Sequence, residues 1–153
     1  MLNPDFHDML HAFSEAGVDY MLVGAYSLAS HGYVRATGDM EQWVRPERHN
    51  AARVLDALRL FGAPTSDLNV TDFESPDVVL QIGVPPRRID VITSIDGVDF
   101  DEAWPRRQEV DVEGIPVPVI GREDLIRNKE ASGRPRDMSD LEGLRNANES
   151  DWT

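Results

Sequence analysis

The chain has 153 residues, 41% of them hydrophobic and 28% charged, which suits a single globular domain with one core and is unlike a disordered or fibrous chain. Acidic residues outnumber basic ones by 28 to 15, and the formal net charge of −13 disfavours broad nonspecific binding to nucleic acids and anionic membranes. The absence of cysteine excludes disulfides and thiolate chemistry, and with no long apolar run we expect a soluble cytoplasmic protein.

Hydrophobic spacing and turn-forming residues predict alternating helices and strands in the first half of the chain. Asn3-Pro4-Asp5 is typical of a helix start and Gly17 of a helix end. The apolar residues 20–23 are too few for a helix and predict a buried strand. The expected elements are a helix over 4–16, a strand over 20–23, a glycine turn at Gly24, a helix over 25–30, a strand over 39–45 and an amphipathic helix from Pro46 to Gly62.

The second half is expected to contain strands followed by helices. The expected elements are a loop over 63–76, strands over 78–84 and 88–93 as a hairpin, a short helix over 100–104, strands over 109–112 and 115–120, and helices over 122–131 and 137–146. Met138, Leu141 and Leu144 give the last helix one apolar stripe. We therefore expect an α/β (α+β) fold, a small mixed β-sheet with flanking helices. The single domain would span 1–153, with its core at about 18–120 and a C-terminal helical pair at about 121–147.

Asp39 and Glu41 are separated by one residue in the strand expected over 39–45. Side chains alternate along a strand, so both acids point to one face, at a separation that lets two carboxylates share a divalent cation. A solvated strand face explains the same pattern, so the pair alone decides nothing. Asp90 lies between Ile89 and Val91 in another apolar strand, where an acid must be exposed, paired or bound to metal.

Three acids brought together would repel one another, by about 4 kcal/mol for each pair about 4 Å apart at an effective dielectric of about 20. Bound Mg²⁺ reverses that sign, because hard carboxylate oxygens are its preferred ligands. Val23-Gly24 ends a strand and opens a helix, where glycine lets backbone N–H groups approach a phosphate. These features together are what metal-assisted phosphoryl or nucleotidyl transfer requires.

This arrangement resembles the nucleotidyltransferase superfamily that shares the DNA polymerase beta palm. The signature of that family is an apolar residue, Gly, then Gly or Ser, a spacer, and Asp-apolar-Asp/Glu-apolar, with a third acid on a later strand. Val23-Gly24-Ala25, Asp39-Met40-Glu41 and Asp90 match it. The segments HGYVRATGDM, GVPPRRIDVITSIDGVDFDEAW and DLIRNKEASGRPRDMSDLEGL look like bacterial minimal and abortive-infection type nucleotidyltransferases, some of which occur in toxin–antitoxin pairs.

The resemblance implies Mg²⁺-dependent transfer of a nucleoside monophosphate from an NTP to a hydroxyl of a protein, a tRNA or a small molecule. It also implies that Asp39 and Glu41 hold two Mg²⁺ ions, and that Asp90 holds one of them and acts as general base. The residues it assigns to the nucleotide are Gly24, Ala25, Ser27 and Lys129.

Two positions depart from the family signature. Ala25 stands where Gly or Ser is usual, which removes a hydroxyl near the phosphates, and Gln42 replaces an apolar residue after the second acid. Both favour an alternative, a binding module with the same fold and a weakened site that acts through protein–protein contact. Its partner would be a cognate toxin or antitoxin.

Basic residues gather near the end of the chain, where they could face an anion: Arg122, Arg127, Lys129, Arg134 and Arg136. Lys129 lies near the apolar side of its helix, where it either extends to water or contacts a phosphate. Arg35 and Thr37, just before the acids, either contact the phosphates or shape the loop, and we expect the second. Asp137 and Asp140 are expected to cap the last helix and to lie in solvent. His7 and His11 lack a third ligand, so we expect surface histidines rather than a zinc site.

Overall fold

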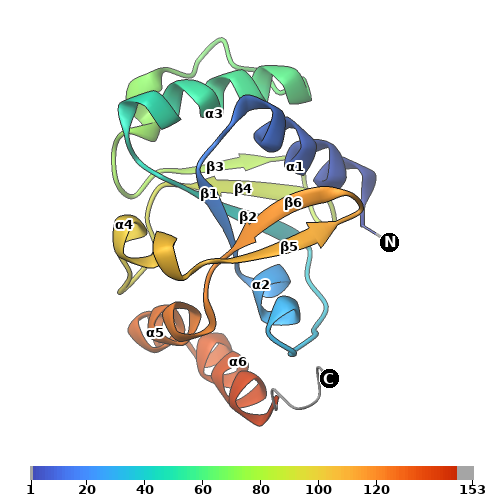
Figure 1. The fold of residues 1–153 in the computed structure, drawn as a ribbon, viewed down its shortest axis with the longest axis vertical. Helices are drawn as coiled ribbons and strands as arrows, with labels where there is room; N and C mark the ends of the chain where they lie inside the picture. Colours follow the sequence, from blue (N-terminus) through green and yellow to red (C-terminus); the bar gives the residue numbers. More distant parts are fainter. Residues whose placement is uncertain (1, 148–153) are drawn as a thin grey trace.

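A mixed six-stranded sheet carries helices on both faces (Figure 1), in a computed structural model that describes residues 2–147. The strands are β1 (Tyr20–Val23), β2 (Asp39–Val44), β3 (Val79–Ile82), β4 (Arg88–Ile92), β5 (Gln108–Val112) and β6 (Ile115–Val119). The helices are α1 (Pro4–Ala16), α2 (Ala25–Ser30), α3 (Arg48–Phe61), α4 (Phe100–Ala103), α5 (Arg122–Ser132) and α6 (Pro135–Asn146), with 3-10 turns η1 (Val70–Phe73) and η2 (Trp104–Arg106). The expected α/β fold with a mixed sheet is confirmed.

The strands lie in the order β3-β4-β2-β1-β6-β5. β1 is antiparallel to β2, whereas β2 is parallel to β4, and in these pairings Val23 lies opposite Glu41 and Glu41 opposite Asp90. Residues directly opposite one another on neighbouring strands point to the same face of a sheet. The register therefore places Glu41 and Asp90 side by side, with the end of β1 next to them.

Each face of the sheet contributes to its own apolar core. One core packs against α1 and α3, and its strand residues include Tyr20, Leu22, Met40, Val44, Ile89 and Val91. The other core contains Met21, Val23 and Trp43 together with residues of α4, α5 and α6. Figure 1 shows the two sets of helices on opposite sides of the sheet. Glu41 and Asp90 share a face with Val23, so the acids lie on the side of the C-terminal helices.

Local signals account for most element ends. Asn3 accepts a hydrogen bond from the backbone N–H of Asp5 at the start of α1, and Gly17 ends that helix in the left-handed conformation, with φ of 69°. The expected hairpin of β3 with β4 forms, and β5 pairs with β6 in a second antiparallel hairpin.

Three local expectations were wrong. The loop expected over 63–76 contains the 3-10 turn η1, and α6 begins at Pro135 rather than at 137, because proline is well suited to the first helical position. Met138 is 49% exposed, so the apolar stripe of α6 consists of Leu141 and Leu144. Across residues 2–147, no helix combines the length and apolar character that crossing a membrane requires.

Gln42 is fully buried on the face that packs against α1 and α3, and neither polar atom of its side chain has a hydrogen-bond partner within the described residues. An unsatisfied buried polar group costs about 1–3 kcal/mol. We therefore expect Gln42→Leu to raise the free energy of unfolding by about 1 kcal/mol or more in urea denaturation. Gln108→Leu, at an exposed position of β5, is the matched control and should change little. A destabilised Gln42→Leu variant would mean that the amide has partners after all.

Candidate active site

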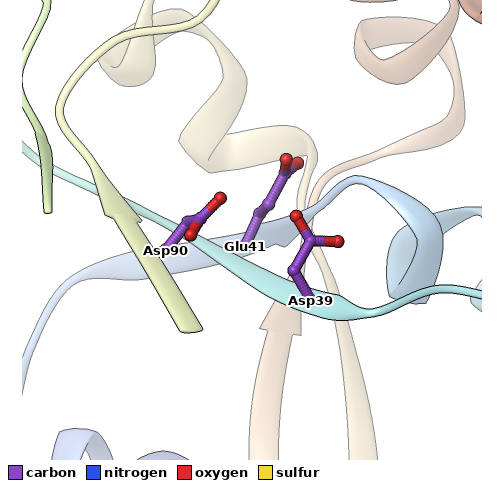
Figure 2. Close-up of side chains that lie close together, drawn as sticks. All are labelled: Asp39, Glu41 and Asp90. Atoms are coloured by element: carbon purple, nitrogen blue, oxygen red, sulfur yellow. The ribbon is translucent and has the colours of Figure 1, made fainter. Parts of the chain in front are cut away.

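Asp39, Glu41 and Asp90 converge on one point above the sheet (Figure 2). One carboxylate oxygen from each lies within 4.8 Å of the others. Two of the residues come from β2 and the third from the parallel neighbour β4, so the strand register alone brings them together. Carboxylate oxygens at this spacing can ligate a shared divalent cation.

The electrostatics of the three acids fit a cation. Burial, followed by the charges of Asp39 and Asp90, raises the pKa of Glu41. Burial also raises the pKa of Asp90, although the charge of Arg88 lowers it. Oδ1 of Asp90 is buried and has no hydrogen-bond partner in residues 2–147. The guanidinium of Arg88 lies 3.0 Å from this oxygen and provides positive charge without a directed hydrogen bond. A hard divalent ion would satisfy the oxygen directly.

Gly24 brings the end of β1 against the acids. Its φ of 71° and ψ of −151° belong to a region that only glycine occupies readily, and a Cβ at this position would collide with the carboxylate of Glu41. The backbone at residue 24 therefore lies so close to the Glu41 side chain that only glycine fits at this position. The glycine turn and the acidic group form one unit.

Gly24→Ala should therefore disturb both the fold and the acids. We expect a loss of about 2–3 kcal/mol in the free energy of unfolding, because backbone strain adds to the collision with Glu41. The matched control is Gly17→Ala, which has a similar φ of 69° but nothing within 4 Å of the added Cβ. That variant should lose only about 1 kcal/mol. Equal losses in the two variants would show that the contact with Glu41 is unimportant.

A cavity of about 330 Å³ opens beside the acids. Its lining is rich in positive charge and includes the glycine turn: Gly24, Ala25, Arg35, Asp39, Glu41, Arg88, Lys129, Arg134, Arg136 and Asp137. Five cationic side chains around a small cavity next to carboxylates suit a metal-bound polyphosphate. Of the five basic residues of the C-terminal segment, Lys129, Arg134 and Arg136 line the cavity.

The five cationic side chains of the cavity, Arg35, Arg88, Lys129, Arg134 and Arg136, form its cationic wall. Three of them are held in place by ion pairs with buried carboxylates. Nζ of Lys129 lies 3.4 Å from Oδ1 of Asp137 and 3.1 Å from Oδ2 of Asp140. Arg35 binds Asp140 through two hydrogen bonds of 2.8 and 3.1 Å, and Nε of Arg134 donates to Asp137 at 2.8 Å. Asp137 accepts from the backbone N–H of Arg134 as a cap would, but the expectation that Asp137 and Asp140 are solvated was wrong. Both carboxylates are buried because three cations surround them.

The structure brings Gly24, Ala25 and Lys129 to the cavity but places Ser27 elsewhere. Ser27 is fully buried, and its hydroxyl donates to the carbonyl of Gly24 at 2.6 Å. This hydrogen bond stabilises the glycine turn. Thr37 donates to the Asp39 carboxylate at 2.9 Å and so shapes the loop before β2, as expected. Arg88, which also lines the cavity, was not predicted as a site residue from the sequence. The signal for it is its position two residues before Asp90, which puts both side chains on one face of β4.

A larger cavity, of about 540 Å³, lies at the other end of β2 beside Arg45. Its acidic residues already have local roles. Asp19 and Asp101 pair with Arg45, Glu47 caps α3 and Asp99 caps α4. The smaller cavity differs from it in having three carboxylates, those of Asp39, Glu41 and Asp90, gathered at one place, and we therefore take it as the candidate active site.

Two solved structures share this architecture, although no protein-family model and no curated protein sequence matches the chain. The lincosamide antibiotic adenylyltransferase LnuA, with lincomycin bound, aligns over 97% of this chain and 99% of its own, with a TM-score of 0.56 and 12% identity. A Thermotoga maritima protein classed as a nucleotidyltransferase aligns over 97% of both chains, with a TM-score of 0.57 and 15% identity. Sequence identities of 12% and 15% establish a shared fold and no more. The chain has the nucleotidyltransferase fold.

Proposed function

We propose that the protein is a Mg²⁺-dependent nucleotidyltransferase that moves a nucleoside monophosphate from an NTP to a hydroxyl group. The observation that carries the proposal is the convergence of three carboxylate oxygens within 4.8 Å beside a glycine turn and a cationic cavity. Mg²⁺ ions bound there would neutralise phosphate charge and orient the attacking and leaving oxygens. Asp39 and Glu41 are the residues that would hold two such ions, and Asp90 would hold one of them.

The residues of the chain have distinct tasks in this reaction. Asp90 accepts the proton of the acceptor hydroxyl, whose oxygen attacks the α-phosphorus. The bond from the α-phosphorus to the bridging oxygen breaks, and pyrophosphate leaves with the electron pair. The cationic side chains of the cavity bind the triphosphate, and the backbone at Gly24 and Ala25 approaches it closely.

The acceptor is best sought among small molecules and protein side chains. LnuA carries the description of a lincosamide adenylyltransferase, which supports a small-molecule hydroxyl as acceptor. The net charge of −13 disfavours a tRNA acceptor, because the phosphate backbone would be repelled at long range. The resemblance to abortive-infection enzymes supports a role in a toxin–antitoxin pair, with a cognate partner.

The positions of Ala25 and Gln42 in the fold make these two departures from the family signature weaker arguments against catalysis. Gln42 points to the face opposite the three acids, so its side chain does not enter the metal site. Ala25 lines the cavity, but the cationic residues there offer the phosphates other partners. Neither substitution removes a carboxylate, and we therefore favour an enzyme over a binding module.

Transfer of label tests the proposal. The protein is incubated with each α-³²P-labelled triphosphate, Mg²⁺ and a cell lysate divided into protein, RNA and small-molecule fractions. We expect label in one fraction with the wild-type protein and none with Asp39→Asn or with EDTA. Asp56→Asn, at an exposed position of α3, should transfer as the wild type does. Absence of transfer with all four triphosphates, with Mg²⁺ and also with Mn²⁺, would overturn the proposal.

A further inference from the structure

Arg88 contacts two of the three acids of the candidate active site. Its Nη2 donates to Oδ2 of Asp39 at 2.7 Å and to Oδ2 of Asp90 at 3.3 Å. The guanidinium is therefore located between carboxylates that would ligate the metal. The strand register accounts for this placement, because Arg88 lies opposite Asp39 and precedes Asp90 by two residues.

The contact between Arg88 and Asp90 is incomplete. Nε of Arg88 and Oδ1 of Asp90 are 3.0 Å apart, yet both atoms are buried and neither has a well-directed hydrogen bond within residues 2–147. The pair therefore has one long hydrogen bond, from Nη2 to Oδ2, and not the two parallel bonds that make buried ion pairs strong. A metal ion on Oδ1 would satisfy Asp90 and would leave Arg88 without this partner.

Arg88 also lines the cationic cavity, together with Lys129, Arg134 and Arg136. An arginine side chain is long and flexible, and its planar fork binds phosphate oxygens in pairs. A guanidinium released from the acids would therefore still face the space in which we place the triphosphate.

We propose that Arg88 serves two ligands in turn, as counter-ion of Asp39 and Asp90 without metal and as a binding residue for the triphosphate once metal is present. The inference rests on the proposed function and adds a coupling to it. Mg²⁺ and the guanidinium compete for the same carboxylates, so metal binding frees Arg88. The freed charge then strengthens triphosphate binding, which links the two binding events.

Arg88→Gln should change two affinities in opposite directions. In calorimetric titration with Mg²⁺ alone, we expect the variant to bind about five- to tenfold more tightly than wild type, because a competing cation is gone. With inorganic tripolyphosphate at saturating Mg²⁺, a probe that needs no base, we expect about tenfold weaker binding, because one charged bidentate contact is lost. Circular dichroism checks that the variant is folded.

Two control variants separate competition from loss of charge. Arg87→Gln removes the same charge from an exposed neighbour outside the cavity and should leave both affinities within roughly twofold of wild type. Arg136→Gln removes a charge from the cavity lining, but in the described part of the chain Arg136 makes no ion pair with the acids. It should also leave the Mg²⁺ affinity within roughly twofold.

The possible outcomes distinguish this inference from the function on which it rests. Unchanged or weaker Mg²⁺ binding in Arg88→Gln would overturn the competition, and unchanged tripolyphosphate binding would overturn the second position of Arg88. Both results leave nucleotidyl transfer standing. If neither wild type nor Arg88→Gln binds Mg²⁺, the metal-dependent function itself is overturned.

Discussion

Glu41→Gln is expected to reduce nucleotidyl transfer by about a thousandfold, because a metal ion contributes several kcal/mol to stabilising the transition state of phosphoryl transfer. Glutamine has the size of glutamate but lacks the charge and the second carboxylate oxygen that a hard cation prefers. The expected result is therefore a folded protein with a disabled metal site. The measurement is label transfer at saturating Mg²⁺, beside wild type.

In the absence of metal, the Glu41→Gln variant should be more stable than the wild-type protein. Burial and then the charges of Asp39 and Asp90 raise the pKa of Glu41 above its ordinary value of 4.5. A raised pKa in the folded state means that the folded protein holds this proton more tightly than the unfolded chain does. Ionisation of Glu41 therefore costs stability as the pH rises above the pKa of the unfolded chain, and Glu41→Gln avoids that cost.

The two effects can be measured on the same preparations. Urea denaturation in EDTA should show the advantage of Glu41→Gln over wild type growing as the pH rises above 4.5, the ordinary pKa of the side chain. Added Mg²⁺ should stabilise the wild type but not the variant, since only wild type binds it. Glu109→Gln, at an exposed position of β5, should match wild type in every assay. A variant that transfers normally and is less stable in EDTA would show that Glu41 is a structural residue.

The fold and the acidic group were predictable because their signals are local. Short apolar runs, glycine turns and helix starts fix the strands, and the alternation of side chains puts Asp39 and Glu41 on one face. To predict that Asp90 lies beside Glu41, one must also know that β2 pairs in parallel with β4. The sequence does not contain a local signal for this pairing. The family resemblance supplied that pairing indirectly, by implying a third acid on a later strand.

The cationic wall was not predictable from such signals. Asp140 looks like a solvated residue of a helix start, and its burial depends on Arg35, which lies 105 positions before it in the chain. Arg88 looks like an ordinary strand arginine until its register with Asp39 is known. Polar residues become buried when distant partners neutralise them, and sequence periodicity contains no information about those partners.

Lys129→Met should destabilise the protein by about 3 kcal/mol, because breaking a buried ion pair leaves uncompensated charge in the interior. Lys129 is the only lysine of the chain, and it is 7% exposed. Its ammonium group contacts both Asp137 and Asp140 and so ties α5 to α6. Arg134 and Arg35 remain as partners in the variant, which keeps the loss at the lower end of the range. Urea denaturation at neutral pH gives the free energy of unfolding.

A second substitution tests whether unpaired charge is the cause. Burial raises the pKa of Asp137, but Arg134 and Lys129 outweigh this and the net pKa is lowered, so the carboxylate is ionised at neutral pH. Adding Asp137→Asn to Lys129→Met removes one of the two carboxylate charges that lost the ammonium group, while Arg134, the remaining partner of Asp137, is exposed and can turn to water. We therefore expect the double variant to be more stable than Lys129→Met alone. Arg145→Met, which breaks an exposed pair with Glu130, should cost no more than about 1 kcal/mol. A double variant that is less stable than Lys129→Met would show that the loss in Lys129→Met does not come from unpaired charge.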